Sequence, residues 1–328
     1  MEKSHSSLNV GVDIGGTKIA LGLVTSEGKI IKQTSFPTYA DKGADWIIDH
    51  LITALKKFIT QAGMDVQAIN SIGIGVPGTV ELKTGNIVLA PNIYWRNVPL
   101  GEKLHTSFPG IPIYVDQDTN TAVLGEYFTC DDPLVENLFF ITISTGIGSG
   151  LILDKKLYRG RFNMAGEIGH IVVEKDGAPC TCGGRGCLQA YARGPAIAET
   201  ALQRMKQGEP SSLTKHITNG QLTAIQVAGA ASKGDQLAQD VLLKAAEYVG
   251  IALANVVTVL NPDLIIIGGG VAQSGGLFIA RVKELAKASC YPPARESFRI
   301  EVTTNWEKSA LIGAGLLYKT LSEASKGR

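Results

Sequence analysis

The sequence predicts an α/β protein with two domains. Its 328 residues exceed the usual length of one domain, since a domain takes roughly 150 residues. Strand-like apolar runs alternate with helix-like segments along most of the chain, as in α/β proteins. Glycine is in excess, with 38 residues, about 12% against an average of about 7%. Two domains suit a protein that closes on a ligand.

The first half contains five strand-like runs and two segments with helical periodicity. The strand-like runs are 8–14, 19–24, 29–36, 71–76 and 111–115, with a small hairpin at 81–89. The helical segments are 45–62 and 119–128, and we expect Asp118 or Thr119 to cap the second.

The second half repeats the opening pattern and then becomes mainly helical. A strand at 138–143, a Gly-rich loop at 144–150 and a strand at 151–153 match the strand–loop–strand order of the N-terminus, which suggests a duplication. The remaining predicted elements are helices at 195–207, 236–260, 276–288 and 309–321 and a buried strand at 264–267. In the last helix, residues 313–315 are small enough to allow close packing.

Composition and charge exclude several classes of function. The 31 Lys and Arg residues nearly cancel the 30 Asp and Glu residues, so the net charge of +1 disfavours nucleic-acid or anionic membrane partners. The apolar stretches near 138–153 and 251–267 are interrupted before about 18 residues, so we expect no membrane span. Residues 1–7 contain no apolar signal core. The sequence thus predicts a cytoplasmic protein with reduced cysteines.

The segment from Asp13 to Lys18 has the groups that bind phosphate. Gly15 and Gly16 allow backbone amides to turn toward an anion, and Thr17 adds a hydroxyl. Lys18 adds a positive charge, and Asp13 is suited to hold Mg²⁺ through water. The alternative for this loop alone is an ordinary hairpin turn with an exposed Asp and Lys.

Two further Gly-rich loops favour nucleotide binding over three unrelated turns. The second loop offers the same groups as the first, and the third follows a buried strand and precedes a helix, where open α/β sheets bind ligands. No Walker motif occurs, and the GxGxxG match at residues 73–78 lies within and just after a strand-like run and opens no helix, which disfavours the commonest nucleotide folds. The residues expected to contact ATP are Thr145, Gly146 and Gly148 in the second loop and Gly268, Gly269 and Gly270 in the third.

Three thiols within eight residues predict a metal site. Zinc takes four tetrahedral ligands, usually thiolate or imidazole, so these thiols need one more ligand. The predicted ligands are Cys180, Cys182, Cys187 and the nearest upstream histidine, His170. With four protein ligands the zinc is structural. The alternative is three unpaired core thiols, and for Cys130 and Cys290 we expect simple burial.

Together these motifs resemble the ROK family of sugar kinases, especially its glucokinase-like members. The resemblance covers nearly the whole chain and lies in residues 13–18, 75–78, 116–120, 144–150, 166–170, 180–187 and 268–271. It implies an actin-like, ribonuclease-H-related fold with two lobes around a cleft. Residues 1–117 form the small lobe, which a C-terminal helix at about 305–328 completes, and residues 118–304 form the large lobe with the zinc-binding knuckle.

The resemblance also implies MgATP, zinc, a hexose substrate and a homodimer or homotetramer. Asp118 is then the general base that accepts the proton of the attacking sugar hydroxyl, although it suits a helix cap equally well. Glu167 and His170 bind sugar hydroxyls, with one ring nitrogen of His170 on zinc. Gly78 brings backbone close to the sugar. Some relatives are repressors with a DNA-binding segment first, for which the roughly eight residues before the first strand leave no room.

Two expected sugar contacts depart from the family pattern. Gln117 replaces the usual Asn and is longer by one C–C bond of about 1.5 Å, and Gln189 replaces the usual Glu and loses its charge. We therefore expect kinase activity with a hexose or N-acetylhexosamine preferred over glucose. Two alternatives remain: a sugar-sensing regulator without catalysis, and a chaperone-like ATPase that leaves the thiols unexplained.

Overall fold

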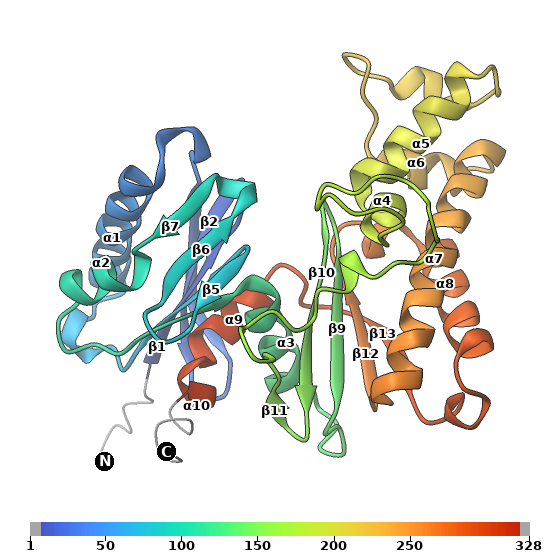
Figure 1. Ribbon diagram of the computed structural model, residues 1–328. Helices are drawn as coiled ribbons and strands as arrows, with labels where there is room; N and C mark the ends of the chain where they lie inside the picture. The colour runs from blue at the N-terminus through green and yellow to red at the C-terminus, as the bar shows by residue number, and fades with distance from the viewer. Residues whose placement is uncertain (1–7, 322–328) are drawn as a thin grey trace. The chain divides into compact units, whose positions relative to one another are not determined.

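The structure is a computed structural model, and it describes residues 8–321 (Figure 1). Residues 1–7, and the part of the expected C-terminal helix beyond residue 321, lie outside the described residues. The chain divides into two compact units. The first unit contains Met1–Leu134, Gly150–Ala165 and Asn305–Arg328, and the second contains Val135–Ser149 and Gly166–Thr304.

Two five-stranded sheets share one topology. The first has the order β3-β2-β1-β4-β8 and the second the order β11-β10-β9-β12-β13. The strands of the first sheet are β1 (Leu8–Ile14), β2 (Lys18–Thr25), β3 (Ile30–Pro37), β4 (Ile72–Val76) and β8 (Ile113–Gln117). Those of the second are β9 (Leu138–Ile143), β10 (Ile147–Leu153), β11 (Lys156–Leu157), β12 (Leu264–Gly268) and β13 (Arg299–Val302). The repeated order agrees with the duplication that the Gly-rich blocks suggest.

In the first sheet β1, β4 and β8 run parallel, and β2 runs antiparallel to β1 and β3. A smaller antiparallel sheet in the same unit has the order β5-β6-β7. Its strands are β5 (Thr79–Glu81), β6 (Asn86–Ala90) and β7 (Trp95–Val98).

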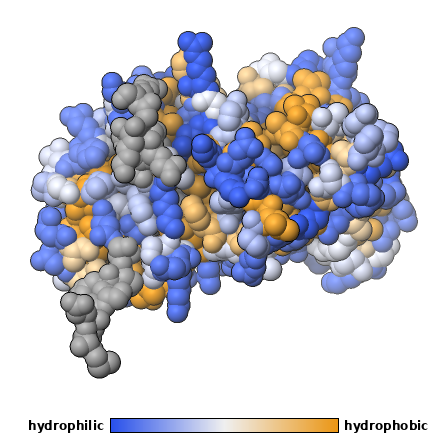
Figure 2. Space-filling model, turned by 90° about the horizontal axis from the view of Figure 1, so that it is seen from below, coloured by the Kyte–Doolittle hydropathy of each residue, from blue (hydrophilic) through white to orange (hydrophobic). Residues whose placement is uncertain are grey.

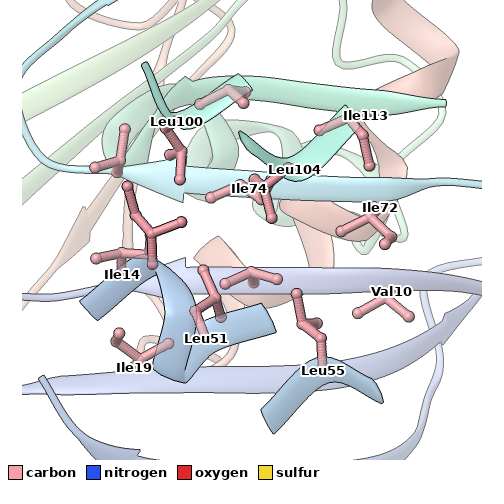
Figure 3. Packing of buried hydrophobic residues seen from close by; sticks show 14 of the residues in the cluster. Val10, Ile14, Ile19, Leu51, Leu55, Ile72, Ile74, Leu100, Leu104 and Ile113 are labelled. Carbon is pink, nitrogen blue, oxygen red and sulfur yellow. The ribbon is translucent and has the colours of Figure 1, made fainter. Parts of the chain in front are cut away.

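Helices cover both faces of the first sheet. On one face, α1 (Ala44–Gln61) and α2 (Leu100–Ser107) bury Leu51, Leu55 and Leu104 against strand residues such as Ile74 (Figure 3). On the other, α9 (Ser309–Leu316) packs against β1, β2, β4 and α3 (Asp118–Phe128). A Cβ at Gly313 would overlap the Thr121 carbonyl oxygen, so the small residues of α9 do permit the close approach that the sequence predicts.

The helices of the second unit pack around α7 (Gln236–Leu260), which contacts α6 and α8. The others are α4 (Gln189–Ala192), α5 (Gly194–Lys206), α6 (Ala224–Ala231) and α8 (Gly276–Ser289). Among the described residues, α7 is the one helix long and apolar enough to cross a membrane, but 61% of its most apolar window is buried. That burial is typical of a core helix. On the face in Figure 2, hydrophilic residues surround separate hydrophobic patches.

Most of the expected elements are present, and the differences have local causes. The final helix is interrupted at Leu317, where α9 ends and α10 (Tyr318–Leu321) begins. The expected cap of α3 was wrong: Gln117 is the N-cap and makes no side-chain cap bond, while Asp118 is the first helical residue. The short elements α2, α6, β7 and β13 were not predicted, because brief segments give little periodicity.

Candidate active site and metal centre

Three parallel strands of the first unit end at the same edge with acidic residues or glycine. Asp13 of β1 pairs in register with Gly75 of β4, and Gly75 pairs with Asp116 of β8. Asp13 and Asp116 are thus two strand spacings apart, about 10 Å. Asp118 follows two residues later at the start of α3. Ligands of open α/β sheets bind outside such carboxyl ends.

The first Gly loop is a β-hairpin turn between β1 and β2. The Gly15 amide donates to the Lys18 carbonyl, 2.9 Å away, so this amide serves the turn. Thr38 directly follows β3, is 1% exposed and holds the loop: its Oγ1 donates to the Gly15 carbonyl at 2.7 Å and its amide to the Thr17 carbonyl at 3.0 Å. Gly16, Thr17 and Lys18 are exposed, as a contact with phosphate requires.

Burial changes the acidity of Asp13. Removal from water raises the pKa of its carboxyl from an ordinary 3.8 to about 6, although the charge of Lys18 lowers it. At pH 7 the carboxylate is mostly ionised and only partly exposed to solvent. Such a group favours a bound cation.

Asp118 lies where β8 passes into α3. Its Oδ1 accepts a hydrogen bond from the Thr119 amide at 2.8 Å, and its backbone carbonyl accepts one from Thr121 Oγ1 at 2.8 Å. The side chain is partly buried. A carboxylate at a helix N-terminus is stabilised in its ionised form by the helix dipole.

The Gln117 side chain is buried and forms a hydrogen bond within the first unit. It is 4% exposed, and its Nε2 donates to the Asn163 carbonyl at 2.9 Å. A carbonyl oxygen only accepts hydrogen bonds, so the amide nitrogen of Gln117 must face Asn163.

Gly78 has φ of 102° and lies against Leu89 so closely that a Cβ would overlap the Leu89 carbonyl oxygen. Only glycine fits there.

The second and third Gly loops meet in the second unit. The Val271 amide donates to the Ile143 carbonyl at 3.0 Å, just before the second loop. Gly269 has φ of 88°, and a Cβ there would overlap that carbonyl oxygen. Ser144 accepts from the Gly194 amide at 2.7 Å. The structure therefore brings Thr145 and Gly146 close to the segment of Gly268, Gly269 and Gly270, while Gly148 already belongs to β10.

The segment with Glu167 and His170 is tied to the strand that follows the second loop. Ser149 Oγ donates to the Gly166 carbonyl, and the turn closes with a bond of 3.0 Å from the His170 amide to the Glu167 carbonyl. Glu167 is exposed. The segment after this turn forms no regular strand, and Val172 makes an isolated bridge to Cys187.

The four predicted metal ligands lie together. Their ligand atoms are all within 4.8 Å of one another. Cys180 Sγ is 3.7 Å from His170 Nδ1, and Cys182 Sγ is 3.8 Å from Cys187 Sγ. Tetrahedral zinc with bonds of about 2.0 to 2.3 Å holds neighbouring ligand atoms about 3.5 to 3.8 Å apart. The donor set and its spacing therefore fit zinc.

Gln189 links this cluster to the second Gly loop. Its Nε2 donates to Cys180 Sγ at 3.4 Å and to Thr181 Oγ1 at 3.1 Å. Its Oε1 faces Gly146, since a Cβ there would lie 4.0 Å from this oxygen. Burial raises the pKa of Cys180, but hydrogen bonds from the Cys182 amide and Gln189 outweigh it and lower the pKa to about 6. Thiolate is the form that binds metal.

Sequence reasoning missed the residues that support these sites. Thr38 clamps the first loop, and Arg159 and Asn163 contact Asp116. Arg159 and Asn163 precede the 166–170 motif closely, but no spacing links them to β8. Sequence reasoning also missed a cavity of about 480 Å³ beside the thiol cluster, between α4, α5 and α7.

The topology and the sites define a class of protein: the chain has the two-lobed actin-like ATPase fold. The ROK family model matches residues 9–321, and the chain belongs to the ROK family. A glucokinase of Halalkalibacterium halodurans is 36% identical over 312 residues, which cover 94% of each chain.

Other relatives include a repressor and a second glucokinase. A xylose repressor of Caldicellulosiruptor bescii is 29% identical over 304 residues, 93% of this chain and 76% of the repressor. The structure of a ROK glucokinase from Streptomyces griseus, in complex with glucose and AMPPNP, has a TM-score of 0.80 and 34% identity. The match covers 95% of this chain and 99% of that one.

Proposed function

We propose that this protein transfers the γ-phosphoryl group of ATP to a hexose hydroxyl and yields a sugar 6-phosphate. The observation that carries the proposal is the acidic strand edge, where Asp13 and Asp116 flank Gly75 and Asp118 follows at the start of α3. Glucokinases among the relatives support the same activity.

Asp118 is the general base of the proposed reaction. Its carboxylate accepts the proton of the attacking hydroxyl as the hydroxyl oxygen bonds to the γ-phosphorus and the bond to the β-phosphate oxygen breaks, which releases ADP. Asp13 would hold Mg²⁺, which neutralises phosphate charge when bound. The residues proposed to contact the phosphates are Gly15, Gly16, Thr17, Lys18, Thr145, Gly146, Gly148, Gly268, Gly269 and Gly270.

The hexose is proposed to bind Gly78, Glu167, His170 and Gln189, with Gln117 beside them. Gln189 directs its Nε2 at Cys180 and Thr181, so its Oε1 is left to accept a sugar hydroxyl. The Gln117 amide nitrogen is occupied by Asn163. These two residues support a preference for a hexose other than glucose, or for an N-acetylhexosamine.

His170, Cys180, Cys182 and Cys187 would hold a structural zinc. The ion would cross-link the 166–170 turn to the thiol loop and fix the His170 ring, so that its other nitrogen can donate to the sugar. We also propose a small lobe of residues 1–117 and about 305–328 and a large lobe of residues 118–304, although residues 118–134 and 150–165 belong to the first compact unit. The protein is proposed to be a cytoplasmic homodimer or homotetramer.

An ADP-release assay over a panel of hexoses and N-acetylhexosamines tests the proposal. We expect ADP release that depends on one of these sugars and exceeds the rate without sugar by at least tenfold. Sugar-independent hydrolysis would instead indicate a chaperone-like ATPase.

The second candidate function is a sugar-sensing regulator. The xylose repressor relative favours it, as do the two departures at Gln117 and Gln189. A regulator would bind sugar, as calorimetry can measure, without releasing ADP. The same sugar panel therefore separates the two functions.

A further inference from the structure

The Asp116 carboxylate is a buried hub of hydrogen bonds. It is 0% exposed. Its Oδ1 accepts from the Gln117 amide at 2.8 Å, Asn120 Nδ2 at 2.8 Å and Asn163 Nδ2 at 3.1 Å. Its Oδ2 accepts from Arg159 Nε at 2.7 Å. A buried carboxylate with this many donors has one fixed orientation.

Two of these bonds come from residues on either side of Asp118 in the sequence. Gln117 precedes Asp118, and Asn120 lies in the first turn of α3, so Asp116 Oδ1 joins the end of β8 to the start of the helix. Thr121 Oγ1 adds a bond of 2.8 Å to the Asp118 carbonyl. The backbone of Asp118 is therefore held on both sides.

The hub is anchored from two other parts of the first unit. The Arg159 side chain is 13% exposed and extends to α10, where its Nη2 donates to Thr320 Oγ1 at 3.0 Å. Asn163, which is 3% exposed with φ of 57°, also accepts from Asn120 through its Oδ1 at 3.0 Å and from Gln117 through its backbone carbonyl. The strand–helix junction thus depends on the loop at 159–163 and on the C-terminal helix.

We propose that Asp116 and Arg159 are positioning residues that fix the orientation of Asp118. The inference rests on the proposed role of Asp118 as the general base. A base must lie within hydrogen-bond reach of the hydroxyl proton, and displacement by about 1 Å can cost roughly 10²-fold in rate. Loss of the hub lowers kcat, while the binding of ATP depends on other residues.

Asp116→Asn tests this in the full-length protein. The asparagine keeps one oxygen to accept from the three donors that now contact Oδ1. Its amide NH₂ faces Arg159 Nε, so that two hydrogen-bond donors oppose each other. We expect kcat to fall about 10- to 100-fold, with the KM for ATP within about threefold. The matched control is Asp45→Asn, because Asp45 forms a 2.6 Å ion pair with Lys103 at an 83% exposed position. Its kcat should be unchanged.

A double-mutant cycle separates positioning from a general loss of structure. In an Asp118→Asn background, Asp116→Asn should lower kcat by less than a further factor of about two, because no base is left to position. A full 10- to 100-fold further loss would overturn the inference, as would a normal kcat for Asp116→Asn alone. Near-normal turnover of Asp118→Asn alone would instead refute the proposed base.

Arg159→Lys provides a second test of the positioning role if the Asp116→Asn protein does not fold. Lysine keeps the positive charge but has no second nitrogen for Thr320 while it pairs with Asp116. We expect a smaller fall in kcat, about 3- to 10-fold, that again disappears in the Asp118→Asn background. A kcat equal to that of the unmodified protein would refute the role of Arg159.

Discussion

Gln117 Nε2 donates a hydrogen bond to the Asn163 backbone carbonyl, 2.9 Å away. The bond spans 46 positions of the sequence, and both side chains are buried. A residue expected to face a sugar therefore also holds the loop that carries Arg159 and Asn163. Substrate preference and loop structure are linked at this position.

Gln117→Asn should break that link. The side chain becomes shorter by about 1.5 Å, so the bond is lost and a buried carbonyl loses a donor. We expect the free energy of unfolding to fall by about 1 to 3 kcal/mol, as chemical denaturation can measure, and the order of preferred hexoses to change. Gln33→Asn, at an exposed position of β3, is the control. Unchanged stability and an unchanged order of hexoses would contradict the link.

Asp118→Asn should remove the general base without changing the fold. We expect turnover to fall by about 10² to 10⁴, measured by coupled ADP release, with a circular dichroism spectrum like that of the unmodified protein. Asp49→Asn, an exposed change on α1, should have no effect on turnover. Near-normal turnover of the Asp118 variant would exclude this residue as the base.

Asp13 should make activity depend on pH. Since its pKa is about 6, the carboxylate that would hold Mg²⁺ is lost as the pH falls through 6. We expect kcat/KM to decline below that pH, and excess Mg²⁺ to restore part of the activity. A flat profile between pH 5 and pH 7, at roughly constant fold stability, would contradict this role.

The raised pKa of Asp13 makes the folded protein less stable at higher pH, although activity is expected to rise with pH. The folded protein binds the Asp13 proton more tightly than the unfolded chain, so stability from this group is present below pH 3.8 and is lost as the pH rises through about 6. Asp13→Asn should therefore raise the free energy of unfolding at pH 7.5 by about 1 to 3 kcal/mol, with little gain near pH 4. Denaturation at both pH values checks it. Equal effects at both would contradict the shift.

Thr38→Val tests the support of the first Gly loop. Valine has nearly the same shape but lacks the hydroxyl that donates to the Gly15 carbonyl at 2.7 Å. We expect KM for ATP to rise about 3- to 30-fold, equivalent to about 0.7 to 2 kcal/mol, and KM for the hexose to stay unchanged. Thr34→Val, exposed on β3, is the control. A rise in the hexose KM alone would contradict a phosphate-binding role.

The sequence was sufficient to predict features that depend on residues close together along the chain. The Gly15 turn, the buried strand before Gly268 and the cluster of Cys180, Cys182 and Cys187 with His170 all follow from spacing and residue type, and the structure has them. The short strands and helices gave too little periodicity. The Asp116 hub could not be predicted, because Arg159 and Asn163 reach it from 43 and 47 positions away and only the folded topology joins them.

Cys182→Ser should disrupt the metal centre. A serine hydroxyl is a poor ligand for zinc, so three of the four donors remain. We expect metal analysis to find about one zinc per chain in the unmodified protein and well below one in the variant, and the melting temperature to fall by several degrees. Cys130→Ser is the matched control, because Cys130 is half-buried and lies outside the four-ligand cluster. Full zinc content and an unchanged melting temperature in the Cys182 variant would show that this thiol is not a ligand.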